Sequence, residues 1–183
     1  MRIVAGEKKG FKLKTLKGLE VRPTLEQVKE SIFNMIASEI GGAVVADLFC
    51  GSGNLGLEAL SRGADKCFFV DSSRDALKVV RENLQSLNFA DKAELMRLQL
   101  PKALINLKDL KNVDVIFADP PYGTPLASET LKTLATNGLL AQDCLLIVEH
   151  SGKMRIGFDE RKYSLLRERK FGQSEVLILR SKK

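Results

Sequence analysis

The sequence predicts an α/β fold in which a mostly parallel sheet carries helices on both faces. Between residues 44 and 149, short apolar segments alternate with segments whose apolar residues recur every three or four positions. Wholly apolar strands are typical of parallel sheets buried on both faces, and the intervening periodicity is typical of the helices that cover them. A chain of 183 residues has the length of one such domain.

The first helix is expected to begin at Arg22-Pro23-Thr24. Thr24 is a suitable N-cap residue, and Gln27, three residues later, completes a capping box. An apolar stripe at helical spacing runs on to Ile36, and Gly41-Gly42 ends the helix. Before it, short apolar runs broken by glycines and lysines predict a β-hairpin or ribbon. We therefore divide the chain into a basic ribbon, residues 1–24, and an α/β domain, residues 25–183.

The rest of the chain supplies the sheet and the helices that cover it. Strands are expected at 44–49, 66–71, 93–98, 113–119 and 144–149, and helices at 54–62, 73–87, 102–110 and 128–136. Segments 163–167 and 175–180 flank Phe171-Gly172-Gln173 and predict a closing antiparallel hairpin. Together these elements predict a seven-stranded sheet that is parallel except for this hairpin.

Composition excludes several classes of protein. The chain contains no apolar run of about 18 residues, so no transmembrane helix is predicted. The N-terminus lacks the apolar segment of a secretory signal, which favours the cytoplasm. Cys50, Cys67 and Cys144 are widely spaced in apolar surroundings and are expected to be buried free thiols. No cysteine–histidine cluster indicates a metal site. A monomer is expected, because no additional apolar helix is visible.

The net charge of +6 is unevenly distributed. Residues 1–24 contain seven Lys/Arg and two acids, residues 25–151 twelve and seventeen, and residues 152–183 ten and four. Basic ends beside an acidic middle favour a catalytic core flanked by surfaces that bind nucleic-acid phosphates, although charge alone also fits a soluble basic protein. The residues expected to bind nucleic-acid phosphates are Arg2, Lys8, Lys9, Lys12, Lys14, Lys17 and Arg22, and Arg22 could instead contact a cofactor.

The loop after the first predicted strand has the features of a cofactor site. Asp47 is followed by a turn that contains Gly51, Ser52 and Gly53 and leads into a helix, where a ligand can approach the backbone closely. Ligands of doubly wound sheets bind at this end of the strands. Asp71, at the end of the second strand, is expected to accept hydrogen bonds from ribose hydroxyls, although an acid there could simply stabilise the next helix.

Two further residues are candidates for cofactor contacts. Phe49 either borders the cofactor or packs in the core. Gln99 follows the third predicted strand, where a polar group could contact an adenine, and its alternative is a solvated loop residue.

The glycine-rich turn also matches the G-x-G-x-x-G pattern of NAD-binding proteins. However, the charge of Asp47 would repel a pyrophosphate, whereas S-adenosylmethionine has no phosphate and carries an ammonium group. We therefore expect S-adenosylmethionine, and an NAD-dependent oxidoreductase is a distant alternative.

The segment Asp119-Pro120-Pro121-Tyr122 follows a buried strand and predicts the chemistry. The prolines have no N–H, so the backbone there offers only carbonyl acceptors, and the Asp119 carboxylate adds another. This arrangement suits an exocyclic –NH2 group, with Asp119 and the Pro120 carbonyl accepting its hydrogens and Tyr122 stacking on the base. Asp119 is also expected to contact the cofactor. The alternative is a proline-rich surface turn.

Several motifs in register resemble one known family. They are Arg2-Ile3-x-Ala5-Gly6, Gly10-x-x-Leu13, Arg22-Pro23-Thr24, Asp47-x-Phe49-x-Gly51-Ser52-Gly53, Gly56-Leu57-Glu58-Ala59-Leu60-Ser61-Arg62-Gly63, Asp119-Pro120-Pro121-Tyr122 and Val148-Glu149-His150. The chain resembles the RsmD family of bacterial methyltransferases over about residues 1–180. This implies a Rossmann-like class I S-adenosylmethionine-dependent fold and methylation of a guanine N2 in 16S rRNA. Gln99 departs from the Asp or Asn usual in that family, and Phe171 from the usual Tyr.

Other functions stay open. Adenine-N6 methyltransferases of DNA or RNA share the Asp-Pro-Pro-Tyr segment, and a non-catalytic rRNA assembly factor could retain the fold. His150, the only histidine, could act as a general base, but methyl transfer to an amine does not require one. Because a short ribbon could hardly select one base in naked RNA, the expected substrate is a protein-bearing small-subunit assembly particle.

Overall fold

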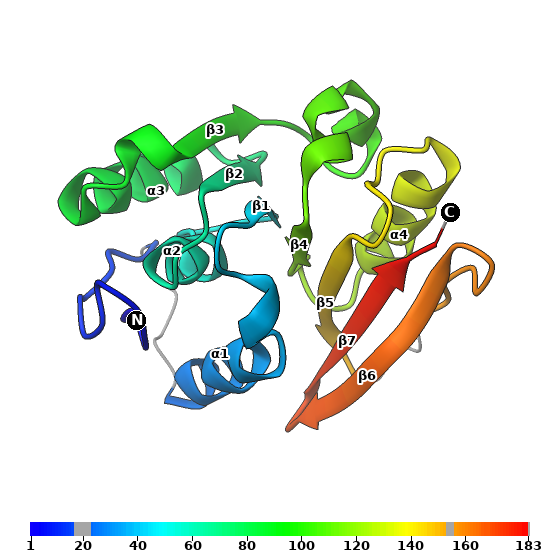
Figure 1. The fold of residues 1–183 in the computed structure, drawn as a ribbon, viewed down its shortest axis with the longest axis horizontal. Helices are drawn as coiled ribbons and strands as arrows, with labels where there is room; N and C mark the ends of the chain where they lie inside the picture. The colour runs from blue at the N-terminus through cyan, green and yellow to red at the C-terminus, as the bar shows by residue number, and fades with distance from the viewer. Residues whose placement is uncertain (17–22, 153–155, 183) are drawn as a thin grey trace.

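The computed structural model describes residues 1–16, 23–152 and 156–182. Its sheet has seven strands in the order β3-β2-β1-β4-β5-β7-β6 (Figure 1). The strands are β1 Val44–Leu48, β2 Lys66–Asp71, β3 Ala93–Arg97, β4 Val115–Ala118, β5 Leu145–Ser151, β6 Tyr163–Phe171 and β7 Ser174–Ser181. Strands β1 to β5 are parallel, and β7 runs antiparallel to both β5 and β6. The predicted fold class, mostly parallel sheet and C-terminal hairpin are confirmed.

The strand order changes direction between β1 and β4. From β1 the chain builds outward through β2 to β3, and then returns to place β4 on the other side of β1. Asp47 and Leu48 of β1 are in register with Phe117 and Ala118 of β4, so the loops after these two strands leave the sheet side by side. A crevice at the carboxyl ends of the strands is expected at such a point.

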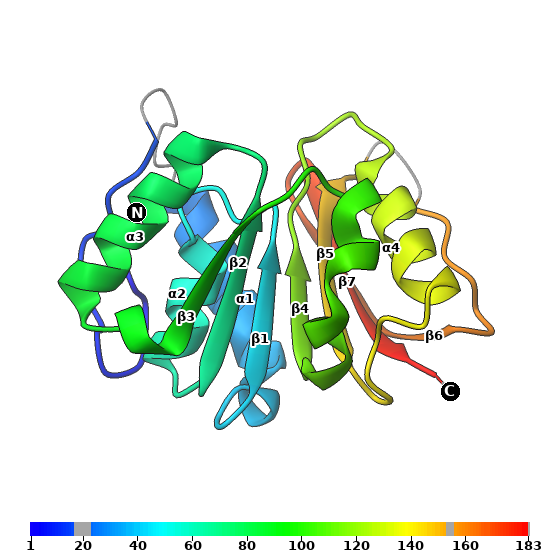
Figure 2. The same ribbon diagram turned by 90° about the horizontal axis from the view of Figure 1, so that it is seen from above.

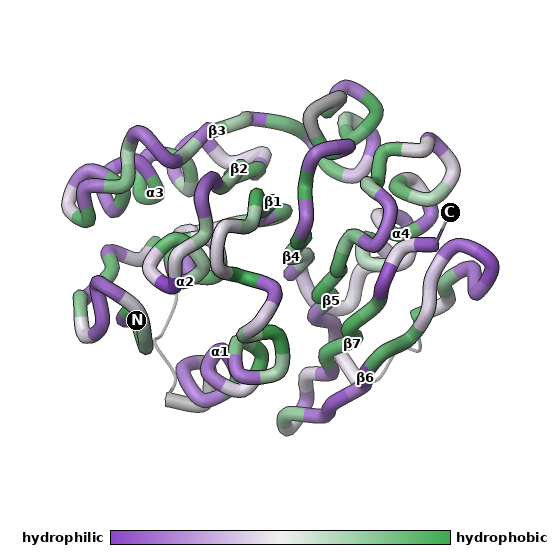
Figure 3. Tube along the Cα trace, viewed as in Figure 1, coloured by the Kyte–Doolittle hydropathy of each residue, from purple (hydrophilic) through white to green (hydrophobic). Residues whose placement is uncertain are grey.

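Helices cover the sheet on both faces (Figures 1 and 2). The helices are α1 Pro23–Met35, α2 Asn54–Ser61, α3 Arg74–Leu87 and α4 Leu126–Thr136. Alternate residues of the strands feed two apolar clusters. Helices α1, α2 and α3 contribute to the cluster that contains Val45 and Phe117, whereas α4 contributes to the one that contains Ala46 and Leu146. Figure 3 shows that β5 and β7 are largely hydrophobic, as strands between two such layers must be.

The prediction of an α-helix at 102–110 is wrong in the type of helix. Two 3-10 turns, Lys102–Asn106 and Lys108–Asn112, occupy this segment. Leu104, Leu107 and Leu110 follow one another at intervals of three and are all buried. Leu104 lies in the first turn and Leu110 in the second, with Leu107 between them, and all three pack in the apolar cluster that contains α4. An interval of three residues matches the three residues per turn of a 3-10 helix.

The N-terminal segment differs from a regular ribbon. Among the described residues before α1, one isolated β-bridge joins Arg2 to Lys12, and Ile3 and Leu13 pack in the same apolar cluster as α2 and α3. Helix α1 begins at Pro23, so Thr24 lies inside its first turn and is not the N-cap. Proline is favoured at a first helical position because its missing N–H would have no partner there.

Two further sequence expectations can be compared with the described part of the chain. None of its helices combines the length and the apolar character that crossing a membrane requires. Cys50, Cys67 and Cys144 are free and buried, as predicted.

Candidate active site

A cavity of about 490 Å³ lies at the carboxyl ends of β1, β2, β4 and β5. The loop after β1 lines it with Phe49, Cys50, Gly51 and Ser52, and the strand ends contribute acidic side chains. Helix α1 supplies one wall with Val28, Lys29 and Ile32, and Met1 also reaches the cavity. The cavity is therefore at the predicted edge of the sheet, where segments distant in sequence meet.

Glycine is needed in the turn after β1 and at the start of α2, for two different reasons. A Cβ on Gly56 would lie 2.4 Å from Cε1 of Phe69, so this glycine lets α2 pack closely on β2. A Cβ on Gly51 would meet no atom within 4 Å, so its open side leaves room for a ligand. The backbone is also unusual at Phe49, whose φ of 60° costs a residue with a side chain about 1–3 kcal/mol. Such strain is commonly concentrated at binding sites.

Asp47 is a buried carboxyl group with little compensation. It is 2% exposed, and its Oδ2 atom accepts a 2.8 Å hydrogen bond from the backbone N–H of Gly56 in α2. Burial, together with the nearby Asp71, raises the pKa of Asp47 to about 8. Since one hydrogen bond does not replace the lost hydration of a charge, this side chain would gain from a cationic ligand in the cavity.

Asp71 fixes the turn that forms the cavity floor. Its two carboxylate oxygens accept hydrogen bonds from the N–H of Gly51, at 2.9 Å, and from the N–H of Ser73, at 2.8 Å. Ser73 in turn caps α3 by accepting a bond from the N–H of Ala76. Each carboxylate oxygen has a second lone pair, so Asp71 can hold the turn and still accept a hydroxyl from a ligand.

The Asp119-Pro120-Pro121-Tyr122 segment lies opposite this turn and borders the same cavity. Asp119 is accessible through the cavity mouth, whereas protein surrounds its carboxyl group on the other sides. This desolvation, followed by the nearby Glu149 and Asp47, raises the pKa of Asp119 above its ordinary value. A carboxyl group shifted in this direction is a better proton acceptor near neutral pH.

Tyr122 is held at the rim by its hydroxyl group. It donates a 2.5 Å hydrogen bond to Oε1 of Glu149 and lies 2.7 Å from Oγ of Ser174. The residue is nevertheless 53% exposed, so a planar group could reach its ring. Sequence reasoning did not predict Glu149 as a partner of Tyr122, although the end of β5 is a natural place for such a residue.

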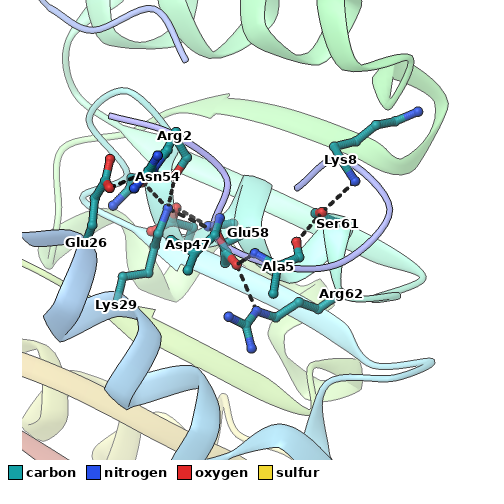
Figure 4. A network of polar contacts seen from close by, with 12 residues as sticks. Arg2, Ala5, Lys8, Glu26, Lys29, Asp47, Asn54, Glu58, Ser61 and Arg62 are labelled. Atoms are coloured by element: carbon teal, nitrogen blue, oxygen red, sulfur yellow. Dashed lines mark hydrogen bonds and ion pairs between the residues drawn. The ribbon is translucent and has the colours of Figure 1, made fainter. Parts of the chain in front are cut away.

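Sequence reasoning also missed a buried ionic network beside the cavity (Figure 4). Glu58 of α2 is fully buried and accepts hydrogen bonds from the N–H groups of Val4 and Ala5, at 2.8 and 2.9 Å. It also pairs with Lys29 at 3.0 Å and with Arg62 at 2.8 Å. The network therefore fastens the N-terminal segment to the helix whose first turn faces the cavity.

Lys29 completes this network from the cavity wall. Its Nζ atom donates to the carbonyl of Arg2 at 2.7 Å and to Oδ1 of Asn54 at 2.8 Å. Burial lowers the pKa of Lys29, and the charge of Glu58 opposes that shift. The close approach of Gly6 is a second fastening, because a Cβ there would lie 1.8 Å from the carbonyl oxygen of Ser61. Two motifs far apart in sequence, around residues 2–6 and 56–63, thus form one unit.

The structure brings most of the predicted site residues together. The residues that line the cavity are Asp47, Phe49, Gly51, Ser52, Asp71, Asp119, Pro120, Pro121 and Tyr122. Gly53 lies behind the turn as the N-cap of α2, with a φ of 80°. Gln99 is exposed and does not line the cavity, so its contact with a cofactor stays a prediction. His150 borders a separate space of about 20 Å³ behind Tyr122.

The predicted RNA-binding residues differ in their surroundings. Arg2 pairs with Glu26 and Lys14 with Glu82, both at 2.9 Å. Lys8 lies 3.6 Å from Glu7. In the part of the segment that the structure describes, the exposed Lys9 and Lys12 have no acidic partner within ion-pair distance. Lys17 and Arg22 lie outside the described residues.

Comparison with known proteins places these features in a family. A family model described as Conserved hypothetical protein 95 matches residues 1–180. The chain is 36% identical to YlbH of Bacillus subtilis over 183 residues, which is 100% of both chains. It is 34% identical to Ribosomal RNA small subunit methyltransferase D of Haemophilus influenzae, over 94% of this chain and 89% of the relative.

Solved structures show the same fold. The yhhF protein of Escherichia coli has a TM-score of 0.84 and 30% identity, covering 100% of this chain and 98% of that one. An RNA methyltransferase of Salinibacter ruber, solved in complex with S-adenosyl-L-homocysteine, has a TM-score of 0.66 and 16% identity over 90% and 95% of the two chains. The fold is that of the class I S-adenosylmethionine-dependent methyltransferases.

Proposed function

Because the chain belongs to the family described as Conserved hypothetical protein 95, we propose that it methylates the exocyclic N2 amine of a guanine in 16S rRNA. The methyl donor is S-adenosylmethionine, and the substrate is a protein-bearing particle on the assembly pathway of the small ribosomal subunit. The observation that carries this proposal is the meeting of a buried acidic cavity with the acceptor-rich Asp119–Tyr122 segment. A relative named as a small-subunit rRNA methyltransferase, 34% identical, supports the choice of RNA.

The residues of the cavity fit the proposed cofactor. Asp47 is a buried carboxyl group with one hydrogen bond, so its ionised form would gain from a cationic partner, and the open side of Gly51 leaves space against the backbone. Asp71 keeps free lone pairs for ribose hydroxyls while it holds the turn. S-adenosylmethionine supplies an electrophilic methyl group on a positively charged sulfur, which suits a cavity lined by Asp47, Asp71, Asp119 and Glu149.

The Asp119–Tyr122 segment would orient the amine. The lone pair of a guanine N2 is delocalised into the ring, so binding must present it in one direction. Asp119 and the Pro120 carbonyl accept the two N2 hydrogens, and Tyr122 stacks on the base from a position fixed by Glu149. Correct positioning can supply roughly 7–11 kcal/mol of a barrier. The raised pKa of Asp119 suits it to accept the proton that the amine releases.

The target base must leave its stack to enter the cavity. Enzymes that modify bases extrude the target nucleotide and read its polar edge within a pocket. The half-exposed ring of Tyr122 at the rim offers the extruded base a stacking surface, worth about 1–3 kcal/mol. The basic residues of the N-terminal segment would hold the surrounding RNA by its phosphates.

The experiment is transfer of a labelled methyl group from S-adenosylmethionine to small subunits isolated from a strain that lacks the gene, followed by nucleoside analysis. N2-methylguanosine is the expected product. N6-methyladenosine would replace the proposal with an adenine methyltransferase. Tight cofactor binding without transfer would exclude this substrate, and the absence of both would favour a non-catalytic assembly factor. The variant Asp119→Asn, checked for folding, should bind the cofactor but transfer little methyl.

A further inference from the structure

The edge strand β6 carries a bulge that redirects its side chains. Leu165 pairs with Leu179 of β7 and Arg167 with Ile178, so Leu166 is an extra residue without a partner. Residues directly opposite each other in antiparallel strands share a face. Ile178 and Val176 belong to the apolar cluster that includes α1, so their partners Arg167 and Arg169 lie on the α1 face of the sheet. A bulge commonly re-aims side chains in this way.

One of these two arginines borders a shallow, open groove. Arg167 lines it from β6, and α1, which lies next to the hairpin in Figure 1, lines it with Gln27, Glu30, Ser31, Asn34 and Met35. The groove has a volume of about 460 Å³. Helix α1 also walls the active-site cavity with Val28, Lys29 and Ile32. One helix therefore separates the two spaces, with a polar side toward the groove.

The charge of β6 is only partly neutralised. Arg167 and Arg169 are exposed, and no acidic group lies within ion-pair distance of either in the described part of the chain. By contrast, Arg161 pairs with Asp159 at 2.9 Å and Arg180 with Glu39 at 3.1 Å. Glu30 is the acid that faces the groove, Met35 is its apolar residue, and Gln27, Ser31 and Asn34 are neutral hydrogen-bonding groups. Such a surface is complementary to a phosphate backbone with sugar hydroxyls.

We propose that the groove between α1 and β6 holds single-stranded RNA adjoining the target nucleotide, with Arg167 and Arg169 contacting its phosphates. This inference rests on the proposed function. Gln27, Ser31 and Asn34 would hydrogen-bond to ribose hydroxyls along the groove. The RNA would then cross the molecule from the N-terminal segment, past the cavity, to β6. The bound strand is thus held on both sides of the extruded base.

The test compares charge-removing variants on the two faces of the sheet. Binding to small subunits from the strain lacking the gene is measured against salt concentration for wild type and for the double variant Arg167→Gln/Arg169→Gln. Each lost contact to a single strand should lower the slope of log K against log salt by about 0.7, so the expected decrease is about 1.4. The matched control is Lys111→Gln/Lys132→Gln, which removes two exposed charges from the α4 side.

The outcomes separate this inference from the proposed function. In the arginine double variant, KM for subunits should rise while kcat, cofactor affinity and the unfolding midpoint stay near wild type. Arg167→Lys/Arg169→Lys should restore the slope, because charge and not packing is responsible. An unchanged slope in the glutamine variant, with normal binding by wild type, would overturn the inference alone. If wild type itself does not bind subunits, the proposed function fails with it.

Discussion

Glu58 in α2 and Asp47 in β1 are both buried acids that contact α2, yet their surroundings are opposite. Glu58 accepts two backbone N–H bonds and pairs with Lys29 and Arg62, so every part of its charge is compensated. Asp47 accepts one bond, from Gly56. The difference separates two uses of a buried carboxylate. A buried carboxylate whose charge is fully compensated stabilises the fold. A buried carboxylate with few partners is instead free to bind a cationic ligand.

The largest expected effect comes from breaking the Glu58 network. Glu58→Gln should lower the free energy of unfolding by about 3–5 kcal/mol, because it leaves Lys29 buried without its counter-charge. Urea denaturation measures this, and limited proteolysis should show an N-terminal segment that is cut more readily. The double variant Lys29→Met/Glu58→Leu should lose less stability than the sum of the losses in Lys29→Met and Glu58→Leu. If Glu58→Gln were as stable as wild type, Glu58 would not stabilise the fold and the proposed difference from Asp47 would be wrong.

Asp47→Asn should have the opposite profile. Its stability should equal or exceed that of wild type, because the variant no longer buries an under-compensated carboxyl group. Its affinity for S-adenosylmethionine should fall by about 1.5–3 kcal/mol, the range for a hydrogen bond to a charged group. Calorimetric titration measures both the affinity and the heat. A variant that binds the cofactor as tightly as wild type would contradict the role assigned to Asp47.

The pH dependence of cofactor binding sharpens the same contrast. The folded-state pKa of Asp47 is about 8, so below that pH a cationic ligand must first displace a proton. Affinity should therefore rise by less than about tenfold between pH 7 and 8.5 and then level off. In Asp47→Asn, any remaining pH dependence of the affinity comes from groups other than Asp47, including those of the cofactor. The difference between the two proteins therefore gives the contribution of Asp47.

The stability of the free protein should change in the opposite sense. The unfolded carboxyl group ionises near its ordinary pKa of 3.8, whereas the folded one keeps its proton until about pH 8. The folded state thus binds more protons over this window, and stability falls as pH rises through it. Thermal unfolding at several pH values, with Asp47→Asn as the reference, measures this contribution. No difference between the two proteins would mean that Asp47 titrates normally.

The smallest effect is expected at Gly51. Gly51→Ala should cost about 1 kcal/mol of stability, because its φ of 53° disfavours a side chain. Since the added Cβ meets no protein atom, its main consequence should be weaker cofactor binding in the open side of the turn. Gly56→Ala is the control, because its Cβ would clash with Phe69 and affect folding instead. If Gly51→Ala binds the cofactor normally, the ligand does not use that side.

The sequence predicted those features that depend on repeated apolar spacing. The strands, the helices that cover them and the acids at strand ends all follow such patterns, and the cavity brings together Asp47, Asp71 and Asp119. It did not predict Lys29 and Glu58, since charged residues on amphipathic helices usually indicate a solvated face. The predicted N-terminal β-ribbon is less regular in the structure, with one isolated β-bridge, for a related reason. The amides of Val4, Ala5 and Lys8 donate to Glu58 and Ser61 of α2, whereas those of Ile3 and Leu13 donate across the segment to the carbonyls of Phe11 and Met1.

The bulge in β6 also bears on whether two copies of the protein associate through their sheet edges. β6 ends the sheet and leaves one row of backbone groups without a neighbouring strand. A long flat edge of this kind can pair with the edge of another molecule and start aggregation. The irregular pairing at Leu165/Arg167, followed by charged side chains, interrupts that edge. Arg167 and Arg169 also place charge on this edge, so we expect that replacing both with valine would favour edge-to-edge association, while the bulge at Leu166 would remain.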